Sequence, residues 1–203
     1  MPDWNDLRAI LHSATSSVAP AICLCVANRD DVLWEEALGY LDPEARTQPV
    51  QTDTLFDLAS VTKLFVTTAG MTLVESGRMA LDQPVSEIVP EFVGERPLAP
   101  YEDPLRPGAV VEVVPPTAER VQAGRVTFRH LLTHTSGLPA WKPLFKVAGG
   151  KGAILNVIHQ SPFAYPTGDR VLYSDLGLIL LAEAMERLTG MGLNEVVKER
   201  VTG

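Results

Sequence analysis

The sequence of 203 residues lacks the features of a membrane-spanning or nucleic-acid-binding protein. No apolar run reaches about 18 residues, the length that a transmembrane helix needs. The chain has 17 basic and 25 acidic residues, and the basic residues form no cluster, so we expect no nucleic-acid partner. The N-terminus also lacks the cationic start and apolar core of a secretory signal. We therefore expect no membrane span and a cytoplasmic location, or a periplasmic or secreted one if the N-terminus has been trimmed.

Cysteine is scarce, and the motifs of several cofactor and metal sites are absent. Cys23 and Cys25 lie two residues apart in a strand-like run, which places them on one face of a strand. We interpret them as a buried, apolar pair in a reducing compartment rather than as a disulfide or a metal site.

His130 and His134 are spaced for one helix face, but no glutamate or third ligand accompanies them, so we assign them structural roles. No P-loop, dinucleotide fingerprint or G-x-S-x-G occurs, and we expect no cofactor and no metal.

Hydrophobic periodicity divides the chain into an N-terminal helix and hairpin and a largely helical remainder. The expected elements are a helix over 3–17 capped by Asp3, a hairpin of strands 21–28 and 32–40, and helices over 60–76, 127–134 and 175–188. In the helix after Ser60, apolar residues recur at three- and four-residue steps: Val61, Leu64, Phe65, Ala69, Met71 and Val74. Gly77 and Gly190 follow two of these helices and indicate where they end.

Residues 93–125 form a proline-rich insertion with no helical period. They include Pro97, Pro100, Pro104, Pro107, Pro115 and Pro116. Residues 110–114 are apolar enough to form a short strand. A long irregular segment of this kind is either an excursion beside a functional cleft or a mobile loop.

Ser60 and Lys63 form an S-x-x-K pair at the predicted start of a helix. A helix N-terminus stabilises a nearby negative charge by about 0.3–2 kcal/mol. This is too little to ionise a serine, so a base is required. For Lys63 to act as that base, its pKa must fall from about 10.4 to about 7–8, which costs about 4 kcal/mol. We expect burial and a neighbouring partner to supply that cost. The alternative is that Ser60 caps the helix and Lys63 is solvated.

Tyr173 and Asp175 are the second pair of candidate site residues, where a loop enters the 175–188 helix. A phenol there can exchange protons with Ser60 if a cation holds its pKa near the working pH. Y-x-D also occurs at Tyr40 and Tyr101, but only Tyr173 precedes a helix. Asp175 is either the N-cap of that helix or an active-site hydrogen-bonding group, and both roles are compatible.

Three successive segments resemble blocks of one family: S-V-T-K at 60–63, L-L-T-H-T-S-G-L-P at 131–139 and Y-S-D-L-G at 173–177. The family is that of the serine β-lactamase-related proteins, which includes class C β-lactamases, D-alanyl-D-alanine carboxypeptidases and esterases. The resemblance implies an α+β fold of the β-lactamase/transpeptidase type, with an antiparallel sheet that includes the N-terminal hairpin. It also implies that Ser60 is acylated, that Lys63 and Tyr173 share the proton transfers, and that Asp175 takes the usual asparagine position.

The implied activity is that of a serine hydrolase acting on esters or amides, with esters, β-lactams or D-amino-acid peptides as substrates. Asp175 in place of asparagine favours esterase or peptidase relatives. We expect residues 1–203 to form a single domain that is C-terminally incomplete, because the family's K/H-x-G strand is not in the sequence. That strand supplies an oxyanion donor worth about 10²–10³ in rate, so we expect the segment alone to be strongly impaired. The alternative is a non-catalytic relative that binds penicillin or peptide, or acts as a scaffold.

Overall fold

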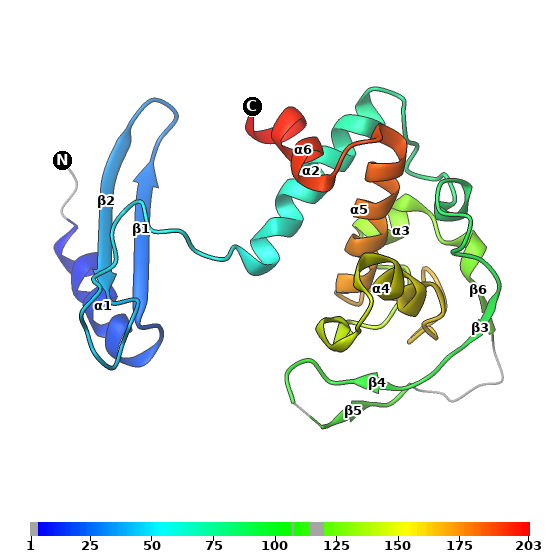
Figure 1. Cartoon of the computed structure of the whole chain (residues 1–203), viewed down its shortest axis with the longest axis horizontal. Coiled ribbons are helices and arrows are strands. Elements are labelled where there is room, and N and C mark those ends of the chain that lie inside the picture. Colours follow the sequence, from blue (N-terminus) through cyan, green and yellow to red (C-terminus); the bar gives the residue numbers. More distant parts are fainter. Residues whose placement is uncertain (1–3, 107, 114–119) are drawn as a thin grey trace. The chain divides into compact units, whose positions relative to one another are not determined.

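The computed structural model describes residues 4–106, 108–113 and 120–203 and divides the chain into two compact units, Met1–Leu58 and Ala59–Gly203 (Figure 1). The first unit contains α1 (Asn5–Ser17), β1 (Ala21–Ala27) and β2 (Val32–Gly39). The second contains α2 (Thr62–Glu75), β3 (Glu95–Pro97), β4 (Tyr101–Glu102), β5 (Val110–Val111), β6 (Arg120–Gln122), α3 (Phe128–Leu132), α4 (Gly150–His159), α5 (Asp175–Thr189) and α6 (Leu193–Val197). Helices and antiparallel strand pairs confirm the expected α+β class. Within the described residues, no helix has both the length and the apolar character needed to cross a bilayer.

The first unit is the hairpin that the sequence predicts, with α1 packed against one of its faces. Strands β1 and β2 pair antiparallel, and the Asn28 side chain closes the turn by accepting the backbone N–H groups of Asp30 and Asp31. Trp4 stacks on the buried Trp34 with ring centroids 5.4 Å apart. Asp3, the expected cap of the first helix, lies outside the described residues.

The two cysteines share one strand face, as expected, but that face is exposed, so the prediction of a buried pair is wrong. The residues that alternate with them, Ile22, Leu24 and Val26, are half-buried. Helix α1 covers only one side of a two-stranded sheet, and the alternation of a strand does not tell which side is covered. The Cys23 thiol donates to the carbonyl of Gln51 at 3.1 Å.

Helix α5 is the central element of the second unit and contacts α2, α3, α4 and α6 (Figure 1). Its apolar residues Leu180, Leu181 and Met185 are fully buried. The helix ends at Gly190, whose φ of +73° is the left-handed conformation that glycine adopts without strain. The sequence therefore predicts both the position and the end of this helix correctly.

Helix α2 buries a different face from the one that its apolar spacing suggests. Val66, Ala69 and Leu73 are buried, whereas Val61 and Leu64 are 49% and 67% exposed. Apolar residues occur all around this helix, so spacing alone does not select the packed face. A β-carbon added at Gly70 would lie 3.7 Å from the Leu181 and Met185 side chains, which shows that this face of α2 packs on α5.

Short strands organise the described part of the 93–125 segment. Strand β3 pairs with β6 and β4 pairs with β5, both antiparallel. The strand expected over 110–114 is shorter than predicted: β5 ends at Val111, Glu112 and Val113 are not in a strand, and Val114 lies outside the described residues.

Helix α3 is capped as expected but is shorter than predicted. Thr127 is its N-cap and accepts the backbone N–H of His130. The helix ends at Leu132, and His134 lies beyond it with a φ of +56°. The two histidines therefore do not share a helix face, because the turn between them breaks the helical spacing.

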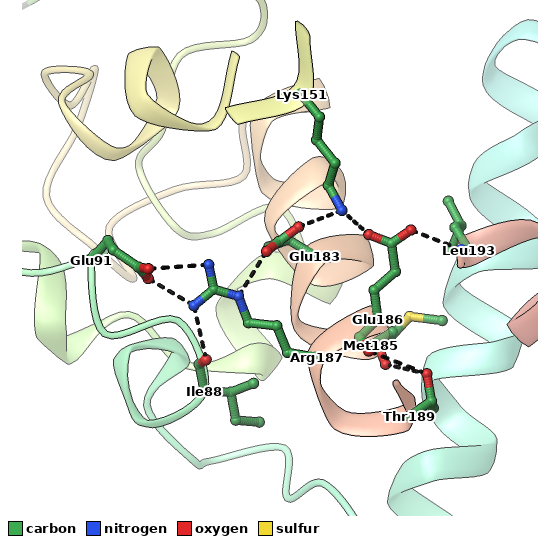
Figure 2. Close-up of polar contacts among 9 residues, drawn as sticks. All are labelled: Ile88, Glu91, Lys151, Glu183, Met185, Glu186, Arg187, Thr189 and Leu193. Atoms are coloured by element: carbon green, nitrogen blue, oxygen red, sulfur yellow. Dashed lines mark hydrogen bonds and ion pairs between the residues drawn. The ribbon is translucent and has the colours of Figure 1, made fainter. Parts of the chain in front are cut away.

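Ion pairs tie α4 and the loop at Glu91 to the C-terminal half of α5 (Figure 2). Glu183 lies at the centre, with its side chain 9% exposed, and pairs with Lys151 at 2.7 Å and with Arg187 at 2.7 Å. Lys151 also contacts Glu186, and Arg187 also pairs with Glu91 at 2.8 Å. Burial by itself would raise the pKa of Glu183, but hydrogen bonds from Lys151 and Arg187 lower that pKa below its ordinary value.

We expect Glu183→Gln to reduce the free energy of unfolding at pH 7 by about 1–3 kcal/mol, less than for a fully buried pair because both cations reach solvent. A carboxyl whose pKa is lowered by folding stabilises the protein above its unfolded pKa and loses that effect as the pH falls through the folded pKa. The difference between wild type and variant in urea unfolding should therefore shrink below about pH 4. Glu75→Gln is the matched control, since Glu75 is exposed and has no ion pair among the described residues. An equal loss of unfolding free energy at pH 7 and below about pH 4 would contradict the stabilising role of the ionised Glu183 carboxylate.

Candidate active site

Two helix starts bring the candidate residues together. Ser60 lies in a short 3-10 turn, Ala59–Val61, that leads directly into α2, and Lys63 lies in the first turn of α2. Asp175 is the first residue of α5, and Tyr173 lies in the loop just before it. Because α2 packs on α5, the first turns of the two helices meet.

The segment after α3 fixes the loop that bears Tyr173. The backbone carbonyl of His134 accepts the N–H of Leu172 at 2.8 Å, and the Nδ1 atom of the His134 ring accepts the N–H of Ser174 at 3.1 Å. The Ser174 hydroxyl donates to the carbonyl of Pro139 at 2.7 Å. These bonds hold the backbone on both sides of Tyr173.

Gly137 permits the close approach of a second backbone segment to this region. Its φ is +84°, and a β-carbon at this position would lie 2.1 Å from the carbonyl oxygen of Tyr165. Only glycine fits both constraints.

The structure places Ser60, Lys63, Tyr173 and Asp175 within reach of one another. The ammonium of Lys63 donates to Ser60 Oγ at 3.1 Å and pairs with Asp175 Oδ1 at 2.7 Å. The same nitrogen lies 4.9 Å from the centroid of the Tyr173 ring. Lys63 is therefore the common neighbour of the other three side chains.

The surroundings of Lys63 do not supply the lowered pKa that it would need in order to act as an uncharged base. Burial lowers the pKa of Lys63, but hydrogen bonds to Asp175 and Tyr173 outweigh it, so the pKa is raised above its ordinary value. The side chain is 20% exposed and has a carboxylate partner, so it lacks the dry, unpaired surroundings that would favour the neutral amine. Lys63 is therefore a cation at neutral pH.

Tyr173 has the opposite perturbation. Hydrogen bonds to Ser60 and to Lys63 lower the pKa of Tyr173 below that of a free phenol. Lys63 is thus the cation that the Tyr173 phenol needs beside it in order to exchange protons near the working pH.

Asp175 does not cap α5. Ser174 is the N-cap, and its hydroxyl accepts the backbone N–H of Gly177. This finding contradicts the capping alternative for Asp175, because Ser174 is one residue nearer the loop and has the extended conformation of a cap. The carboxylate of Asp175 is instead directed at Lys63.

His134 is a site neighbour that residue spacing does not reveal. Its ring lies 4.7 Å from the Tyr173 ring. Burial and the nearby charge of Lys63 lower the pKa of His134. The only signal in the sequence is its place inside the 131–139 block.

Pockets flank the four residues. One of about 560 Å³ is lined by Ser60, Tyr173 and Asp175 together with residues of 101–111 and Trp141. Another of about 320 Å³ adjoins Lys63 and Asp175 between α2 and α5. The first has the size of a small-molecule site. In the described ranges, no group of three or more acidic, histidine or cysteine side chains is arranged to hold a metal ion.

The chain resembles characterised hydrolases in sequence and in fold. It is 35% identical over 190 residues to the esterase EstB of Burkholderia gladioli. That alignment covers 85% of this chain and 42% of EstB. It is 28% identical to the lovastatin esterase of Penicillium rubens, over 76% of this chain and 38% of that protein. The solved octameric penicillin-binding protein homologue from Pyrococcus abyssi is 25% identical and superposes with a TM-score of 0.74, covering 98% of this chain and 42% of that one.

The chain thus spans less than half the length of these relatives. The model of the Beta-lactamase family matches residues 8–203. This match includes the three segments that carry Ser60, His134 and Tyr173, and it extends over nearly the whole chain. The chain therefore belongs to the Beta-lactamase family, whose members include esterases and penicillin-binding proteins.

Proposed function

We propose that this chain carries the nucleophile and the proton-transfer groups of a serine hydrolase that cleaves esters or amides through an acyl-enzyme on Ser60. The observation that carries the proposal is the position of the Lys63 ammonium, 3.1 Å from Ser60 Oγ and 2.7 Å from Asp175. This cation lowers the pKa of Tyr173. An ester substrate is favoured over a β-lactam because Asp175 occupies the position where β-lactamases usually have asparagine.

In the first half of the proposed reaction, the Tyr173 phenolate takes the proton from Ser60 as Oγ attacks the carbonyl carbon. Lys63 donates to Oγ, so the seryl proton is free to point toward Tyr173. The Tyr173 hydroxyl then returns the proton to the departing alcohol or amine, which leaves the acyl group on Ser60.

In the second half, Tyr173 takes a proton from water, which attacks the acyl carbon, and the proton passes to Ser60 as the acid is released. In this proposal Lys63 remains protonated throughout, which the raised pKa of Lys63 supports. Its positive charge stabilises the phenolate and the developing oxyanion.

We expect Ser60→Ala to abolish turnover of p-nitrophenyl acetate, with kcat/KM falling at least about 10³-fold. Thr68→Ala is the matched control, because that hydroxyl lies two turns along α2 and donates to the Leu64 carbonyl. Intact-mass spectrometry should show a transient acyl adduct on wild type and none on Ser60→Ala. A stable adduct without turnover would favour the ligand-binding alternative, and Ser60-independent turnover would refute the nucleophile. The same assay tests whether residues 1–203 by themselves are strongly impaired.

We expect kcat/KM of wild type to rise with pH and to level off below pH 10, the ordinary value for a phenol, because Lys63 lowers the pKa of Tyr173. The negative charge of Asp175 raises the pKa of Tyr173. Asp175→Asn should therefore move this limb to lower pH. The control Asp82→Asn removes an exposed carboxylate that pairs with Arg129 and should leave the limb in place. A wild-type limb that does not level off below pH 10 would rule out Tyr173 as the titrating base, and a limb that moves to higher pH in Asp175→Asn would show that Asp175 acts mainly by positioning Lys63.

A further inference from the structure

In the part of the β4–β5 connection that the structure describes, residues 103–106 are bound together by a nearly buried carboxylate. Asp103 accepts the backbone N–H of Leu105 at 2.9 Å and the Arg106 guanidinium at 2.8 Å. Its side chain is only 9% exposed. The hydrogen bond from Leu105 and the pairing with Arg106 lower the pKa of Asp103, so it stays ionised at neutral pH. The turn is therefore set by polar contacts rather than by apolar packing.

The residue that this turn presents is an apolar one. Leu105 is 87% exposed, although its backbone N–H donates to the Asp103 carboxylate. Such an arrangement costs the free energy of hydrating an isobutyl group unless a bound molecule covers it. Leu105 lines the pocket of about 560 Å³ that also contains Ser60 and Tyr173.

The rest of the pocket lining is largely apolar and has no cationic member. Tyr101, Val111, Trp141 and Leu172 complete its walls. Among the described residues that line it, the charged ones are Asp103 and Asp175, and none is lysine or arginine. Both lining carboxylates already have a cationic partner, Asp103 in Arg106 and Asp175 in Lys63. A substrate carboxylate would therefore lose water here without gaining a cation from the lining residues, whereas a neutral apolar group would cover exposed carbon.

We propose that Tyr101, Leu105, Val111 and Trp141 form a subsite for an apolar aliphatic or aromatic substituent of a neutral ester, and that this subsite excludes substituents bearing a carboxylate. The proposal rests on the proposed function, since it places the substituent beside Ser60. It assigns to Tyr101, Leu105 and Val111, which belong to the proline-rich insertion, the role of a substrate-binding wall, with Leu105 as a specificity-determining residue.

The first experiment compares p-nitrophenyl esters from acetate to octanoate on wild type, Leu105→Ser and the control Leu55→Ser, a leucine that is 97% exposed outside the pocket. Each fully buried methylene is worth about fourfold in binding, and because the pocket is partly open we expect a gain in kcat/KM of at least about 30-fold from acetate to octanoate. Leu105→Ser should lower the octanoate-to-acetate ratio at least about fivefold, and Leu55→Ser should not change it. A parallel series of alkyl acetates, from ethyl to octyl, tells whether the subsite takes the acyl or the alcohol group.

The second experiment tests the charge rule with mono-p-nitrophenyl suberate, which has the chain length of the octanoate ester and a terminal carboxylate. We expect its kcat/KM to be at least about tenfold lower than that of the octanoate ester on wild type. Leu105→Lys should raise the suberate-to-octanoate ratio. Equal turnover of the two esters, or no dependence on chain length in either series, would overturn the subsite.

Binding to Ser60→Ala separates this proposal from the proposed function. Isothermal titration calorimetry of that variant with the octanoate and acetate esters measures the subsite without chemistry. If wild type shows no Ser60-dependent turnover, tight binding of the octanoate ester that Leu105→Ser weakens would still support the subsite. If turnover depends on Ser60 but both esters bind equally, the subsite is wrong and the hydrolase proposal stands.

Discussion

The ion pair between Lys63 and Asp175 is the interaction on which the candidate site depends. It joins the first turns of α2 and α5, the two helices whose packing also forms the core of the second unit. An ion pair that is half open to solvent adds little to stability, since Asp175 is 48% exposed. Its importance is geometric: it holds the ammonium in the one place from which it reaches both Ser60 and Tyr173.

This pair also decides how charge is divided in the site. A carboxylate beside the ammonium keeps Lys63 protonated, and a protonated Lys63 favours ionisation of Tyr173. The pKa of Tyr173 therefore reflects hydrogen bonds with Ser60 and Lys63, which lower it, against burial and the charge of Asp175, which raise it. The same four side chains would have a different proton distribution with a neutral amide at position 175.

The sequence predicts the elements whose signals are local. The β1–β2 hairpin follows from alternation and its turn, and the C-terminal end of α5 follows from Gly190, whereas the N-cap expected at Asp175 is Ser174. The sequence does not predict features that depend on contacts with another element of the fold. Which face of β1 is covered, and whether Lys63 is charged, depend on α1 and Asp175, and no periodicity encodes those contacts. The four site residues were found because their motifs come from a known family; spacing alone left their roles open.

Backbone strain lies next to the groups that the site must hold. Non-glycine residues rarely have a positive φ, yet Ala59 has +44° and His134 has +56°. Ala59 directly precedes Ser60, and His134 binds the backbone on both sides of Tyr173. Such conformations cost about 1–3 kcal/mol each and persist only where surrounding contacts enforce them. The hydrogen bonds of His134 supply that enforcement for the Tyr173 loop, and they require its Nδ1 to be unprotonated. The lowered pKa of His134, set by burial and by Lys63, is thus part of the same arrangement that positions the phenol.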